Sequence, residues 1–213
     1  MNILITGASG SGTTTLGVAL ATHLHGVALD ADSYYWLPTE TPYTQRRDKS
    51  ERNALLIKDM QASETVIISG SIMNYGDSLE NLFDLIVFLY LPAEIRIPRL
   101  KAREEARFGS ASPEFLDWAA QYDSGPAVGS RSLANHTAWL CQRTCPVLRL
   151  EGDMTVEARV RHVVAELERL AFYPTHKKAR TRRAFCLPVI RRPQKRPLSA
   201  RPYRSRNGTS RPP

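Results

Sequence analysis

The chain of 213 residues has no apolar run long enough to cross a bilayer. Its most apolar stretches, such as Thr65–Ser69 and Leu85–Leu91, are short and interrupted. The N-terminus leads directly into a strand pattern, with neither the basic region nor the cleavage site of a signal peptide. These absences argue against a membrane partner, and we expect a cytoplasmic protein.

Cysteine is scarce and odd in number. Cys141 and Cys145 have no neighbouring pair of cysteines or histidines that would complete a zinc site, and Cys186 stands alone. We therefore predict reduced thiols rather than metal ligands or disulfides.

Acidic residues are missing from one end of the chain. Residues 174–213 hold 13 of the 29 Lys and Arg residues, 7 of the 14 prolines and no Asp or Glu. The remaining 16 basic and 21 acidic residues give residues 1–173 a net charge of −5, although the whole chain carries +8. Composition thus predicts one folded domain, 1–173, and a disordered basic tail, 174–213. The tail could bind RNA, DNA or an anionic membrane. The absence of an aromatic stacking pattern favours a solvated extension instead.

Within residues 1–173, short apolar runs alternate with helical patterns and no internal repeat is visible. The predicted strands are Asn2–Thr6, 26–32, 65–71, 83–92 and Val147–Leu150. The predicted helices are Thr14–His25, Asp48–Ala62, Ala93–Phe108 (bent or capped early by Pro98), 112–122, Arg131–Thr144 and Val156–Phe172. This alternation predicts an α/β fold with a five-stranded parallel sheet and helices on both faces.

Lysine is missing where a glycine-rich loop would normally carry it. Residues 5–17 read ITGASGSGTTTLG, which matches the spacing G-x-x-x-x-G-K-[ST] except that Thr13 occupies the lysine position. Gly7 and Gly12 should allow backbone conformations closed to other residues, so that successive N–H groups cradle phosphate oxygens. Thr14 could place its hydroxyl on a magnesium ion. The predicted phosphate-binding residues are Gly7, Ala8, Ser9, Gly10, Ser11, Gly12, Thr13, Thr14 and Thr15. The alternative is a strand-to-helix turn with no ligand.

Together with LDADSYYW, VIISGS and RLKAREEARFG further along, this loop resembles the P-loop kinases of small molecules and nucleotides. That group includes adenylate, shikimate, gluconate and uridine kinases. More narrowly, the chain resembles a bacterial set of adenylate-kinase-like proteins whose loop contains the sequence G-T-T. The resemblance covers roughly residues 1–170. It implies a three-layer P-loop fold with a helical lid, a bound nucleoside triphosphate (ATP or GTP) with Mg²⁺, and an acceptor beyond the strand ends.

Two aspartates follow the second strand, where open parallel sheets bind ligands. By the resemblance, Asp32 matches the acceptor-side aspartate and would be catalytic, and Asp30 would contact the substrate. Alternatively, one of them caps the next segment. Tyr34 heads an aromatic run that could stack on a base or sugar or simply pack in the core. Gly70 closes the third strand and is a further predicted substrate contact.

Arginines could supply the positive charge that the loop lacks. Arg99, Arg103 and Arg107 share one helix face. The resemblance places them in a mobile lid, with Arg103 and Arg107 catalytic and Arg99 binding substrate. The alternative is a solvated helix laced with ion pairs. Arg46, Arg47 and Arg52 fall where those kinases hold an acceptor and would suit an anionic or phosphorylated one. A charged helix start on the surface is the other interpretation.

Two functions remain in competition. The first is an ATP-dependent phosphotransferase acting on a nucleotide, nucleoside or other small acceptor, and the second is a nucleotide-binding module that has lost catalysis with the loop lysine. The aspartates and the arginine series favour the enzyme. Nucleic-acid binding through the tail would need no phosphate-binding loop at all.

Overall fold

A single parallel sheet forms the centre of the computed structural model, which describes residues 1–125 and 131–172. Its strands are β1 (Asn2–Gly7), β2 (Val27–Asp30), β3 (Val66–Ser69), β4 (Leu85–Tyr90) and β5 (Val147–Glu151). They lie in the order β2-β3-β1-β4-β5, and every neighbouring pair is parallel. The predicted five-stranded parallel sheet is confirmed.

Alternate residues of the three inner strands point to opposite faces of the sheet, as the period of a strand requires. Leu4, Ile68 and Phe88 lie in one buried cluster, whereas Ile5 and Val87 lie in the other. Both faces of the inner strands are therefore apolar and buried, which explains the continuous hydrophobic runs in the sequence.

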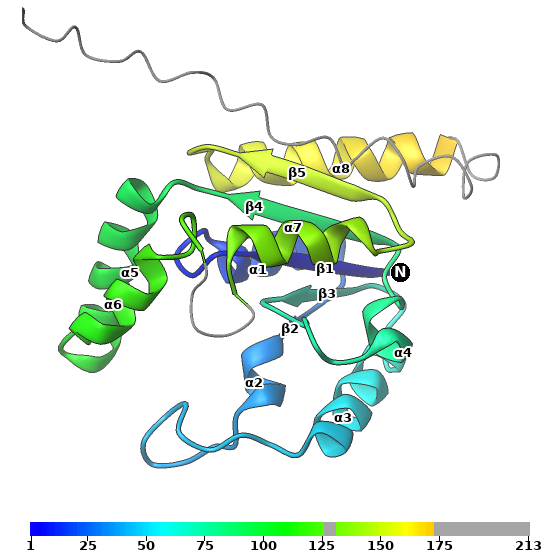
Figure 1. Ribbon diagram of the computed structural model, residues 1–213. Coiled ribbons are helices and arrows are strands. Elements are labelled where there is room, and N and C mark those ends of the chain that lie inside the picture. The colour runs from blue at the N-terminus through cyan, green and yellow to red at the C-terminus, as the bar shows by residue number, and fades with distance from the viewer. Residues whose placement is uncertain (126–130, 173–213) are drawn as a thin grey trace, which may run out of the picture.

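Helices cover both faces, so the fold has three layers (Figure 1). One cluster packs against α1 (Thr13–His23) and α8 (Val156–Phe172), through residues such as Leu16, Leu20 and Val163. The other packs against α3 (Lys49–Gln61), α4 (Asp77–Glu80) and α7 (Leu133–Cys141), through Leu56, Leu79 and Trp139. Burying both faces in this way is what stabilises a parallel sheet.

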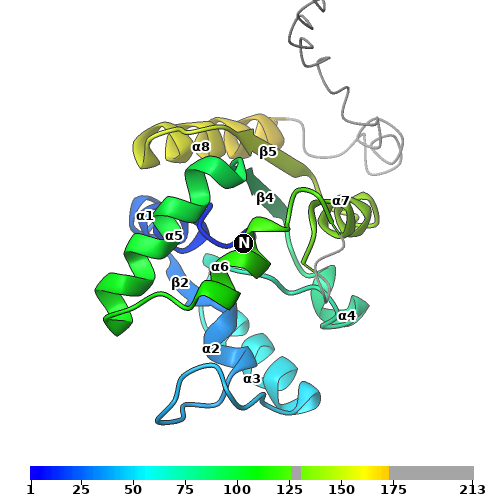
Figure 2. The same cartoon turned by 60° about the vertical axis from the view of Figure 1, so that its left-hand side comes forward.

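Two further helices, α5 (Ala93–Phe108) and α6 (Pro113–Ala120), stand at the carboxyl ends of the strands. Figure 2 brings this pair forward, between α8 above and α2 (Ala31–Tyr35) with α3 below. The fully buried Arg96 side chain joins the two helices, donating from Nη1 to the Ala119 carbonyl at 2.7 Å and from Nη2 to Asp123 at 3.2 Å. We call α5 and α6 together the arm.

The sequence predictions differ from the structure mainly at element ends. The short helices α2 and α4 were not predicted, and α7 is shorter than the predicted Arg131–Thr144. The predicted helix Ala93–Phe108 is confirmed as α5, with Pro98 inside it. Cys145 is a free cysteine, while Cys186 and the predicted basic tail lie outside the described residues. No helix in residues 1–125 and 131–172 combines the length and apolarity that a bilayer span requires.

Candidate nucleotide and acceptor site

The glycine-rich loop lies between β1 and α1, at the carboxyl edge of the sheet. β1 is central, with β3 on one side and β4 on the other, so the loop sits at the kind of position where open α/β sheets bind ligands. Gly7 pairs with Leu89 of β4. A Cβ at Gly7 would lie 2.5 Å from the Leu89 carbonyl oxygen, so only glycine fits there.

Gly7 was predicted to adopt a backbone conformation closed to other residues, and that reason is wrong. Its φ is not among the positive values in the described chain, and the requirement at Gly7 is space. Gly12 does adopt such a conformation, with φ of 91° and ψ of 27°. The left-handed turn at Gly12 is what redirects the chain from the loop into α1.

The first turn of α1 leaves its backbone donors available. Gly12 is the N-cap, and no described side chain caps the helix there. The first backbone bond of the helix runs from the Leu16 N–H to the Gly12 carbonyl, and the first turn contains no acidic residue. Thr14 and Thr15 are exposed on this turn, and Thr13 is half-buried. A helix start of this kind, preceded by a glycine-rich loop, is suited to bind phosphate.

Asp30 ends β2 and caps the next helix. Its Oδ1 accepts a hydrogen bond from the Asp32 N–H at 3.0 Å, so the capping alternative holds for Asp30. Burial raises the pKa of the Asp30 carboxyl, and the charge of Asp32 adds to this, while the backbone bond and the charges of Arg107 and Arg103 lower it. These influences place the arginines of the arm within electrostatic reach of the end of β2.

Asp32 faces an arginine that sequence reasoning did not single out. Arg131 Nη2 lies 3.4 Å from Asp32 Oδ1, although the two residues are 99 positions apart, and both side chains are partly exposed. Arg131 also borders a small pocket beside the glycine-rich loop. The residues that line this pocket are Ala8, Ser9, Trp118, Ala119, Tyr122 and Arg131. The pocket thus joins the loop, the arm and the Asp32 side of the site.

A second unpredicted feature is the burial of Arg52. Its guanidinium carbon lies 3.5 Å from the centroid of the Tyr75 ring and 5.3 Å from that of Tyr35. Its Nη2 is buried without a hydrogen-bond partner among the described residues. Burial raises the pKa of Tyr75 to about 12, and the charges of Arg52, Asp32 and Arg131 also act on that hydroxyl. These charged groups therefore form one cluster, and Arg52 does not belong to a surface helix start.

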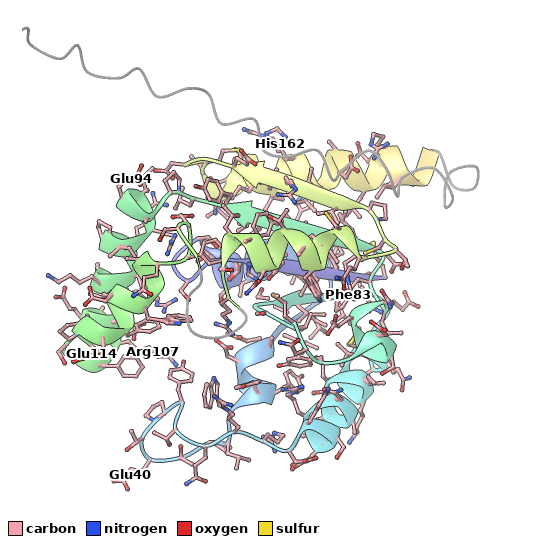
Figure 3. All side chains as sticks on the ribbon, viewed as in Figure 1. Glu40, Phe83, Glu94, Arg107, Glu114 and His162 are labelled. Atoms are coloured by element: carbon pink, nitrogen blue, oxygen red, sulfur yellow. The ribbon has the colours of Figure 1, made fainter. Side chains whose placement is uncertain are left out.

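The arm presents its three predicted arginines differently. Arg99 donates from Nη2 to both carboxylate oxygens of Asp153, at 2.9 and 2.8 Å, and Arg103 pairs with Glu104. Arg107 lies over the ring of Tyr43 at 5.7 Å, which links the end of the arm to the loop before α3. Figure 3 labels Arg107 and Glu114 at the same end of the arm, above the loop that carries Glu40.

Tyr34 and Arg47, two predicted substrate contacts, make hydrogen bonds within the protein. The Tyr34 hydroxyl donates to Asp59 at 2.6 Å. Arg47 donates from Nε to the Tyr34 carbonyl at 3.1 Å and from Nη1 to Glu51 at 2.7 Å. Gly70, by contrast, lies beside Ala31 and Asp30: a Cβ there would be 3.9 Å from Asp30 Oδ1. The sequence carried no signal for Arg131, whereas Arg52 was among the arginines predicted to lie near an acceptor.

The sequence is related to known proteins along most of the folded part. Residues 3–112 match the family described as AAA domain. The chain is also 44% identical over 174 residues to the uncharacterized protein YqaC of Bacillus subtilis (strain 168). That match covers 76% of this chain and 95% of YqaC.

Solved kinase structures share the fold at low sequence identity. A deoxyadenosine kinase from M.mycoides with bound dATP has 15% identity and a TM-score of 0.52, covering 79% of this chain and 100% of that chain. A gluconokinase from Sinorhizobium meliloti 1021 has 19% identity and a TM-score of 0.51, and the match covers 82% of this chain and 97% of that chain. A shikimate kinase from Bacteroides thetaiotaomicron has 20% identity and a TM-score of 0.50, and the match covers 79% of this chain and 98% of that chain. The three-layer fold is therefore that of P-loop small-molecule kinases.

Proposed function

Because the chain belongs to the AAA domain family and has the fold of P-loop small-molecule kinases, we propose that it is an ATP-dependent phosphotransferase with a small anionic hydroxy acceptor. The observation that carries the proposal is the uncapped start of α1, since the pocket beside the loop is lined by Arg131, which also pairs with Asp32. Donors suited to phosphate and groups suited to an acceptor thus converge on one site.

The glycine-rich loop would hold the triphosphate through backbone N–H groups at Gly12 and in the first turn of α1. The Thr14 hydroxyl is exposed at that turn and would hold Mg²⁺. When bound, Mg²⁺ neutralises charge that develops on the β- and γ-phosphate oxygens. Arg103 and Arg107 are the cations that the arm would bring to the transferring group in place of a lysine at position 13.

Asp32 would act on the acceptor. Its carboxylate is partly exposed beside Arg131, so it can accept the proton of an acceptor hydroxyl. Arg52 and Arg131 favour an acceptor with negative charge, since the unpartnered Nη2 of Arg52 is a donor for which an anionic oxygen would compensate. Asp30 keeps the Asp32 backbone in place as the cap of α2.

The competing function is a nucleotide-binding module without transfer, favoured by one observation. Thr13 cannot place a point charge on the phosphates. The two functions differ in what Thr13→Lys should do: for a phosphotransferase the new ammonium should preserve or raise transfer, because it would reach phosphates already held by the loop.

Purified protein titrated with ATP or GTP and Mg²⁺ in a calorimeter should bind one of them at millimolar concentration or below. A panel of nucleotides, nucleosides and small hydroxy acids should then reveal nucleotide-dependent phosphorylation. Asp32→Asn should suppress transfer and spare nucleotide binding. Binding without transfer to any acceptor, in both the wild type and Thr13→Lys, would leave the nucleotide-binding module as the function. No binding would reject both.

A further inference from the structure

A buried arginine reaches the glycine-rich loop from the far end of the folded chain. Arg159 lies in the first turns of α8, is only 5% exposed, and donates from Nη1 to the Ser11 carbonyl oxygen at 2.8 Å. The two residues are 148 positions apart. A Cβ on Gly12 would lie 3.0 Å from the same Nη1, so the guanidinium also packs against the next residue of the loop.

This contact determines the direction of one peptide plane. In a trans peptide the C=O of one residue and the N–H of the next point in opposite directions, and the described chain contains no cis bond. Because the Ser11 carbonyl points at Arg159, the Gly12 N–H points away from Arg159. No described backbone carbonyl accepts that N–H. It is the donor that immediately precedes the uncapped first turn of α1.

Arg159 has no carboxylate as a hydrogen-bond partner in residues 1–125 and 131–172. Asp153 is the nearby carboxylate, and both of its oxygens accept hydrogen bonds from Arg99 of the arm. Asp153 therefore hydrogen-bonds to Arg99, and no ion pair joins it to Arg159 within the described residues. Arg159 Nε is buried without a partner in the described part of the chain, and Nη2 reaches only the Gly152 carbonyl at 3.5 Å. Burying a cation with so few hydrogen-bond partners costs free energy, and such a group calls for a functional explanation.

We propose that Arg159 is a positioning residue for nucleotide binding: it turns the Ser11–Gly12 peptide so that the Gly12 N–H faces the phosphates, and its charge offsets the loop lysine that Thr13 replaces. The bond to Ser11 is charge-assisted, and it polarises the peptide so that the Gly12 N–H becomes a stronger donor. This inference rests on the proposed function, because it assumes that the loop binds a triphosphate.

The test compares Arg159→Ala with Arg161→Ala, which removes an exposed arginine from the same helix. Calorimetric titration with ATP and Mg²⁺ should show about tenfold to a hundredfold weaker binding for Arg159→Ala, the usual effect of losing one hydrogen bond to a charged phosphate, here the bond from the Gly12 N–H. Arg161→Ala should bind like the wild type. Arg159→Lys keeps the charge and one donor, so it should recover part of the loss.

A spectroscopic measurement separates positioning from mere support of the fold. In the wild type, addition of ATP should shift the Gly12 amide proton strongly downfield in an NMR spectrum, and in Arg159→Ala that shift should shrink while the shift at Thr14 persists. If ATP binds the wild type but leaves the Gly12 amide unmoved, or binds Arg159→Ala with unchanged affinity, the inference is overturned alone. If ATP does not bind the wild type, the proposed function is overturned with it.

Discussion

Asp30 is a carboxylate whose surroundings oppose its charge. Burial raises its pKa above the ordinary value of 3.8, and the charge of Asp32 acts in the same direction. The folded state therefore binds a proton more readily than the unfolded chain between pH 3.8 and the higher folded pKa. Stability from this group falls as the pH rises through that interval, and the full cost is present at neutral pH.

Asp30→Asn should consequently stabilise the protein at pH 7. The amide oxygen can still accept the Asp32 N–H, so the cap of α2 is kept while the partly buried charge is lost. We expect the free energy of unfolding to rise by about 1 kcal/mol at pH 7 and to be unchanged near pH 3, where wild-type Asp30 is protonated. Urea denaturation at the two pH values measures this, and equal stability of variant and wild type at pH 7 would contradict it.

Local patterns in the sequence reveal some of the site residues and not others. Gly12 and Asp32 belong to local patterns, a loop of fixed glycine spacing and an acidic strand end. Arg131 meets Asp32 only because α7 returns along the sheet, and Arg159 meets Ser11 only because α8 packs beside α1. No spacing rule encodes such contacts, since they arise from packing between distant segments.

At the scale of elements, the strands were the most predictable part. The runs VIIS and LIVFLY are buried on both faces, and that burial is why their sequences are continuously apolar. The short helix α2 escaped prediction because its five residues form less than two turns, too few to show a helical period. The function of the arm likewise stays a prediction. The position of Arg107 depends on how the end of the arm packs near Tyr43, which the sequence does not encode.

Arg107 offers a direct test of the arm. Its guanidinium carbon lies 5.7 Å from the centroid of the Tyr43 ring, and its charge opposes the burial that raises the pKa of Asp30, so the end of the arm lies near the proposed acceptor side. If Arg107 stabilises the transferring phosphoryl group, Arg107→Ala should lower kcat by about a thousandfold with little change in ATP affinity. Lys101→Ala is the matched control, because Lys101 is an exposed cation of the same helix that pairs with Glu105. Equal kcat values for the two variants would leave Arg107 as an ordinary surface residue.

At the scale of the whole molecule, charge divides the chain into two parts with different expected partners. Residues 1–173 carry a net charge of −5, so the folded part should repel nucleic acid, and residues 174–213 contribute thirteen positive charges. Both buried clusters are built from residues 3–170. The division into a kinase-like domain and a tail remains a proposal, because residues 173–213 lie outside the description.

Removing residues 174–213 should leave the folded part and its nucleotide site intact. Thermal unfolding and ATP titration of the shortened chain should match those of the full chain, because the strands and helices that form both clusters are retained. Any affinity of the full chain for RNA or DNA should disappear on truncation. If the tail makes six to ten phosphate contacts, that affinity should fall by about 10³-fold or more between 50 and 200 mM salt. Mobility-shift assays at the two salt concentrations measure this effect. A shortened chain that unfolds, or that binds RNA as tightly as the full chain, would show that the boundary at residue 173 is misplaced.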